Sequence, residues 1–236
     1  MITKDLKEYA EHHWISFQKT ITDISSNGKN SLVNSNTEIY CFDDICLSIF
    51  NKNKAPTSAD GLSITEKEIE LIEFKSGFKR KITKKSFQKE MGFCKEAGKI
   101  CEDYWKLFFK NQKKEIDELV SSIRNKAVES YITLEKHIFP RCNETNIHMP
   151  LKYVVVIDED EIDYMEDTLS DLAGKGNAQD NHFTSIKRAL YRLTNQFDVS
   201  GTPYYYDQIV VLSAQDFYYR LQKRNGKSKK PTPECV

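Results

Sequence analysis

The sequence predicts an α/β (α+β) protein in which a mixed central β-sheet is flanked by helices. Residues 151–158 and 206–212 are apolar runs rich in β-branched side chains, which are typical of buried strands. Residues 87–134 carry two long apolar stripes with helical spacing. With 236 residues and 39% hydrophobic content, the chain can bury a sizeable core. We expect a single domain over residues 1–224 and a basic, disordered tail over residues 225–236.

The first fifty residues predict two amphipathic helices. Residues 4–24 carry apolar side chains at spacings of three and four, which indicates one helix that is buried on one side. Residues 37–50 repeat this pattern, and a polar loop separates the two segments. The side chains expected to face the core are Leu6, Ala10, Trp14, Phe17, Ile21 and Ile24 in the first helix, and Ile39, Phe42, Cys46 and Ile49 in the second.

A tight β-hairpin is predicted between residues 58 and 75. A connection of two or four residues within positions 65–68 sets its register, in which opposed residues share one face of the sheet. Lys75 lies two residues after Glu73 and therefore shares that face. Two adjacent carboxylates repel each other unless a cation lies between them, so this face predicts a metal ion. The expected pairs are Ile64 with Ile69, Leu62 with Leu71, and Asp60 with Glu73.

The remaining elements follow in order along the chain. After a basic segment, residues 87–108 and 116–134 predict two helices, between which the chain turns or continues at residues 111–114. The strand at 151–158 leads into an acidic loop, a helix at 183–193 and the last strand at 206–212. Ser213 and Asp216 have the spacing of a capping box, which predicts a final helix.

The charge is balanced overall but unevenly distributed. The formal net charge is zero, yet residues 75–90 contain seven basic side chains and residues 158–171 contain eight acidic ones. A polarised surface of this kind can hold a polyanion on one side. No apolar run approaches the roughly 18 residues that span a bilayer, and the N-terminus lacks an apolar signal core. We expect a cytoplasmic protein with no membrane partner, whose six cysteines are buried thiols.

The order of these features resembles the PD-(D/E)XK nuclease superfamily, which includes restriction endonucleases, resolvases and repair nucleases. Asp60 matches its first acidic position, Glu73 the second and Lys75 the lysine, while Ala59 stands where the motif name has proline. The resemblance covers roughly residues 37–110. It implies a restriction endonuclease-like core with long helices after the catalytic hairpin.

The resemblance also implies a chemistry. Asp60 and Glu73 would bind Mg²⁺ or Mn²⁺, because carboxylate oxygens are hard ligands, and Lys75 would orient water or stabilise developing charge. The substrate would be nucleic acid, with DNA favoured over RNA, in restriction, repair or phage defence, and a homodimer is compatible. The residues expected to contact phosphates are Lys79, Arg80, Lys84 and Lys85. A further acid on an early helix is left open among Glu8, Glu11, Glu38 and Asp43.

Two alternatives remain open. One is a catalytically inactive protein of the same fold that binds nucleic acid or another protein. The other is an ordinary surface hairpin in which Lys75 forms salt bridges with Glu73 and Asp60, each contributing about 0–1 kcal/mol.

Overall fold

The protein folds around a mixed six-stranded sheet with the strand order β1-β2-β3-β4-β5-β6. The structure, a computed structural model, describes residues 4–28, 30–50, 54–78, 99–142, 149–159, 182–199, 201, 203–224 and 226. The first four strands pair antiparallel, whereas β4, β5 and β6 are parallel neighbours. The predicted mixed sheet with flanking helices is therefore confirmed. The strands are β1 (Gln18–Thr20), β2 (Glu38–Cys41), β3 (Gly61–Ile64), β4 (Ile69–Lys75), β5 (Leu151–Ile157) and β6 (Gln208–Ser213).

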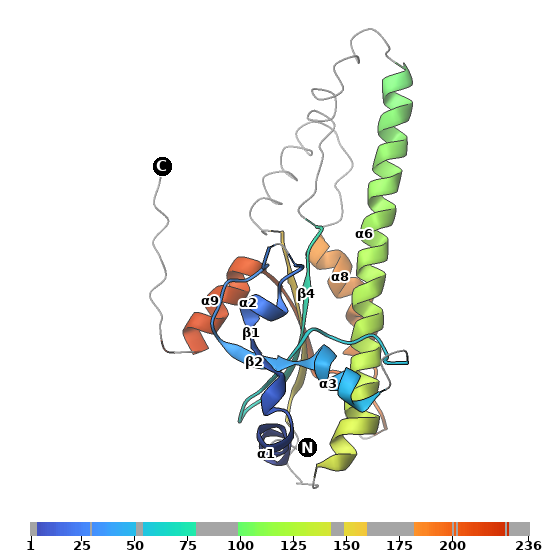
Figure 1. The fold of residues 1–236 in the computed structure, drawn as a ribbon. Helices are drawn as coiled ribbons and strands as arrows, with labels where there is room; N and C mark the ends of the chain where they lie inside the picture. Colours follow the sequence, from blue (N-terminus) through green and yellow to red (C-terminus); the bar gives the residue numbers. More distant parts are fainter. Residues whose placement is uncertain are drawn as a thin grey trace.

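The helices form a layer on each face of the sheet (Figure 1). The sheet has an apolar core on each face. Successive residues of β5 point to opposite faces, so Val155 packs in the larger core and Val154 in the smaller one. The larger core is covered by α1 (Lys4–His13), α3 (Phe42–Ile49), α6 (Lys99–Thr133) and α8 (His182–Leu190). The smaller core is covered by α2 (Ile21–Ile24) and α9 (Ala214–Arg224). Short helical turns complete the fold: η1 (Ile15–Phe17), η2 (Leu134–Ile138), η3 (Phe139–Arg141) and η4 (Tyr191–Leu193).

The predicted hairpin has the predicted register. Leu62 lies opposite Leu71 and Ile64 opposite Ile69, and four residues, 65–68, connect the strands. The Thr65 amide donates to the Glu68 carbonyl, and the Thr65 hydroxyl accepts from the amide of Glu68, so the turn closes on itself. All the apolar pairs on this face belong to the larger core.

The two helices predicted for the first fifty residues are wrong in part. The first ends at His13, and the strand β1 occupies residues inside the range expected to be helical. The apparent single stripe belongs to two cores, because Leu6 packs on one face of the sheet and Ile21 on the other. The segment 37–50 likewise begins as β2 and becomes helical only at Phe42.

The long helix α6 runs for 35 residues without a turn at 111–114. Ile123 and Ala127 are fully buried against the sheet, as the apolar stripe predicts. Its N-terminal part extends past the end of the sheet (Figure 1). The later elements are also confirmed: α8 with η4, β6 and α9 lie where expected, and the Ser213 hydroxyl caps α9 by accepting from the Asp216 amide.

Several predicted features lie outside the described residues. These are the basic segment from Lys79 onward, most of the acidic loop after Glu159, and the tail apart from Gly226. Cys41, Cys46 and Cys142 are buried free thiols, as expected. Over the part of the chain that the structure describes, no helix combines the length and apolar character required to cross a membrane.

Candidate active site

Asp60 and Glu73 come together at the end of the hairpin. Asp60 directly precedes β3, and its Oδ2 accepts from the Phe74 amide at 2.7 Å. Glu73 lies in β4, one position beyond the last ladder pair between Gly61 and Ile72. The side chains therefore meet as the predicted register requires.

The cation between the two carboxylates is a lysine of α6. The Lys126 ammonium lies 2.8 Å from Asp60 Oδ1 and 2.9 Å from Glu73 Oε2. It is only 21% exposed, so these contacts are shielded from solvent. The repulsion between the carboxylates is thus relieved by an ammonium, where the sequence predicts a metal ion.

Lys126 belongs to a polar ridge that α6 presents to the hairpin. Ser122, Lys126 and Ser130 are spaced four residues apart and therefore lie above one another on one side of the helix. The Ser122 hydroxyl accepts from the Lys75 ammonium at 3.3 Å, and the Ser130 hydroxyl accepts from the Ala59 amide at 2.8 Å. The four-residue spacing is a signal in the sequence, but it does not say which element the ridge contacts.

Glu73 is the most strongly perturbed carboxylate of this site. Its side chain is fully buried, and Oε1 has no hydrogen-bond partner among the described residues. Burial and the neighbouring Asp60 charge raise the pKa of Glu73 while Lys126 lowers it, and the net result is a pKa of about 8. One ammonium shared by two carboxylates leaves Glu73 short of positive charge.

Asp43 on α3 is the early acid that lies beside the site. It accepts a short hydrogen bond from the Ser58 hydroxyl, two residues before Asp60. Burial raises the pKa of Asp43, Lys126 lowers it and Asp60 adds to the rise, so the three groups act on one another electrostatically. The other candidates lie elsewhere: Glu8 and Glu11 are exposed on α1, and Glu38 lines a groove against α9.

Lys75 shares the face of Glu73, as predicted, and its charge lowers the pKa of that carboxyl. Its ammonium donates to Ser122, however, and the salt bridges expected of Lys75 are made by Lys126. The structure thus brings Asp60, Glu73 and Lys75 into one site. The phosphate-contacting candidates Lys79, Arg80, Lys84 and Lys85 lie outside the described residues.

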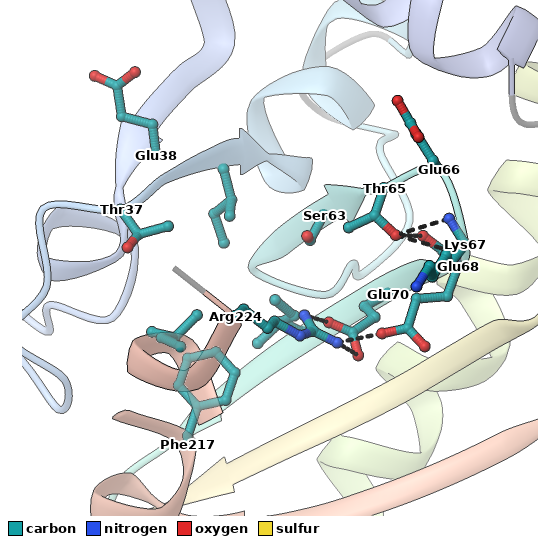
Figure 2. A pocket seen from close by; sticks show the side chains of 13 residues that line it. Thr37, Glu38, Ser63, Thr65, Glu66, Lys67, Glu68, Glu70, Phe217 and Arg224 are labelled. Atoms are coloured by element: carbon teal, nitrogen blue, oxygen red, sulfur yellow. Dashed lines mark hydrogen bonds and ion pairs between the residues drawn. The ribbon is translucent and has the colours of Figure 1, made fainter. Parts of the chain in front are cut away.

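A second charged cluster on the other face of the sheet provides a contrast. Glu70 is fully buried in β4, and Arg224 donates from Nη1 to its Oε2 at 2.6 Å, while Arg220 pairs with its other oxygen. Figure 2 shows Arg224 bonded to both Glu68 and Glu70; these residues and Phe217 line a groove of about 520 Å³. Both oxygens of Glu70 are paired, so this cluster ties α9 to the sheet.

The donor set at Asp60 and Glu73 fits a small divalent cation. Their oxygens are hard ligands, and the unpartnered Glu73 Oε1 is a free acceptor in a buried position. Among the described residues, no group of three or more His, Cys, Asp or Glu side chains is placed to hold a metal. Mg²⁺ is commonly bound through one or two carboxylates and keeps several waters, so two carboxylates suffice.

Comparison of the chain with protein-family models, with curated proteins and with solved structures finds no significant match.

Proposed function

We propose that this protein is a divalent-metal-dependent nuclease that hydrolyses phosphodiester bonds of nucleic acid, with DNA favoured over RNA. The observation that supports this most is the pair of adjacent carboxylates, Asp60 and Glu73, of which one is fully buried with an unpartnered oxygen. Folding does not gain from a buried acceptor without a partner. Perturbed carboxylates of this kind are concentrated at functional sites.

Each residue has a role in the proposed reaction. Asp60 and Glu73 would hold Mg²⁺ or Mn²⁺, with the backbone carbonyl of Phe74 as a further ligand. When bound, the ion would supply Lewis acidity and lower the pKa of water. Lys75, held towards the site by Ser122, would orient the attacking water or stabilise the charge that develops on the phosphate. Asp43 would add negative charge that strengthens cation binding.

The second candidate is a nuclease-fold protein that binds nucleic acid or protein without cleavage. Lys126 favours it, because this ammonium already contacts both carboxylates at 2.8 and 2.9 Å. An amine that permanently replaced the ion would leave a stable site without hydrolytic chemistry.

A cleavage assay separates the two candidates. Purified protein is incubated with single- and double-stranded DNA and RNA in the presence of Mg²⁺ or Mn²⁺, and thermal unfolding is followed with and without the ion. The nuclease cleaves at least one substrate and melts at a higher temperature with metal. Asp60→Asn, Glu73→Gln and Lys75→Met abolish cleavage, whereas Glu135→Gln, an exposed glutamate after α6, leaves it unchanged.

Asp43 is tested by calorimetric titration with MnCl₂, with its neighbour Asp44 as the control. Asp43→Asn weakens Mn²⁺ binding by about three- to tenfold, since a nearby negative charge is lost from a partly buried site. Asp44→Asn is the matched control, because Asp44 pairs with Lys19 at 2.6 Å.

Absence of cleavage on every substrate, together with an unchanged melting temperature, would exclude the nuclease and leave the binding module.

A further inference from the structure

Lys126 lies in the position that the metal ion would take. Its ammonium contacts one oxygen of each carboxylate, Asp60 Oδ1 and Glu73 Oε2. An ion bound to these oxygens at about 2.1 Å would fall within the space of the ammonium. The two positive charges would also repel each other strongly in a partly buried site. The lysine and the ion therefore exclude each other.

We propose that Lys126 is a built-in competitor of the divalent cation: its ammonium holds Asp60 and Glu73 together in the metal-free protein and leaves them when the ion binds. This inference rests on the proposed function, because it takes the same two carboxylates as the metal ligands. It assigns to α6 a role in setting how tightly the metal binds.

The exchange needs only a side-chain movement. Ile123 and Ala127 are fully buried on either side of Lys126, and Ser130 accepts from the Ala59 amide, so the helix backbone is fixed against the hairpin. The lysine side chain has a flexible four-carbon stem and is 21% exposed, which gives the ammonium a route towards solvent. Asp60 meanwhile stays in place, since its Oδ2 accepts from the Phe74 amide.

The affinity for metal measures directly how strongly Lys126 competes with the ion for Asp60 and Glu73. Calorimetric titration with MnCl₂ is compared for wild type, Lys126→Met and Arg124→Met. Lys126→Met binds Mn²⁺ at least about tenfold more tightly, because the ion no longer has to displace an ammonium from two carboxylates. Arg124→Met is the matched control: it removes one charge from the same helix, but Arg124 is exposed and lies about 200° around the helix from Lys126. Its affinity equals that of wild type.

Stability without metal provides a second readout. In EDTA, Lys126→Met melts at a lower temperature than wild type, since two carboxylates lose their shared cation. Mn²⁺ then raises the melting temperature of the variant by more than it raises that of wild type.

The outcomes distinguish this inference from the proposed function. If wild type binds Mn²⁺ and Lys126→Met binds it equally or less tightly, the competition is refuted and the metal site stands. If only the variant binds, Lys126 does block the site and the wild-type protein is not a metal enzyme. If neither binds, both ideas are refuted.

A measurement on wild type covers the case in which the variant does not fold. The NMR signal of the Lys126 ammonium is identified by its absence from Lys126→Arg and followed during titration with Mg²⁺. The signal shifts or broadens as the ammonium leaves Asp60 and Glu73. An unchanged signal at Mg²⁺ concentrations that raise the melting temperature would overturn the inference.

Discussion

Glu73 combines three properties that rarely coincide in a structural residue. It is fully buried, it lies beside a second carboxylate, and one of its oxygens has no partner among the described residues. Glu70, three residues earlier in β4, is equally buried but has both oxygens paired with arginines. The unpaired oxygen makes Glu73 a candidate reactive group, whereas the fully paired Glu70 belongs to an ion pair that ties α9 to the sheet.

The raised pKa of Glu73 predicts a pH-dependent stability. Its pKa is about 8 in the folded protein and 4.5 in its ordinary state, so between these values the folded protein holds a proton that the unfolded chain releases. The contribution of Glu73 is therefore fully present below about pH 4.5 and is lost as the pH rises through 8. Urea unfolding of the metal-free protein is measured from pH 5 to pH 8, and Glu73→Gln removes this part of the decline. Parallel curves for the variant and wild type would show that Glu73 does not titrate in this range.

At the scale of elements, α6 supplies Lys126 and the two serines on either side of it to the site. Its apolar stripe packs on the sheet and turns this polar ridge towards the hairpin. Packing of the stripe and the geometry of the site are thus coupled through one helix.

Because the apolar stripe of α6 is buried against the sheet, shortening one of its side chains should lower the stability of the protein. Ile123 is fully buried, so Ile123→Ala lowers the free energy of unfolding by about 2–4 kcal/mol through lost burial and a residual cavity. Arg124→Ala, the exposed neighbour, changes it by less than about 0.5 kcal/mol. Denaturant unfolding of both variants measures the difference, and equal stabilities would show that the stripe does not hold the helix.

The hairpin could be predicted from the sequence, because its apolar alternation and its four-residue connection determine the register locally. The boundaries near the N-terminus could not. The three residues of β1 are polar, and the apolar residues around them serve cores on opposite faces of the sheet, which imitates one helical stripe. Lys126 was missed for a different reason: 53 residues separate it from Glu73, and only the docking of α6 brings them together.

At the scale of the whole molecule, the sheet separates two charged clusters. The candidate site lies on the face covered by α6, and the Glu70 cluster lies on the face covered by α9. The strand β4 contributes a glutamate to each, because successive side chains of a strand point to opposite faces.

This separation predicts that the two clusters are energetically independent. Arg220→Met leaves Glu70 with one arginine instead of two and lowers the free energy of unfolding by about 1–3 kcal/mol. The same variant leaves Mn²⁺ affinity unchanged, since distant sites without shared partners behave additively. Lys223→Met, an exposed position on α9, is the control for loss of charge. A change of Mn²⁺ affinity in Arg220→Met would show that β4 transmits strain between its two faces.

The polar ridge of α6 also determines where the chain can change in length. A single residue inserted between Ser122 and Ser130 would rotate everything beyond it by about 100°, which would turn one part of the ridge away from the hairpin. The same insertion near the N-terminal end of α6, where the helix extends past the sheet, would leave the ridge in place and alter only how far the helix projects. Relatives of this protein should therefore vary freely in the length of the projecting segment and keep the spacing of eight positions between Ser122 and Ser130 constant.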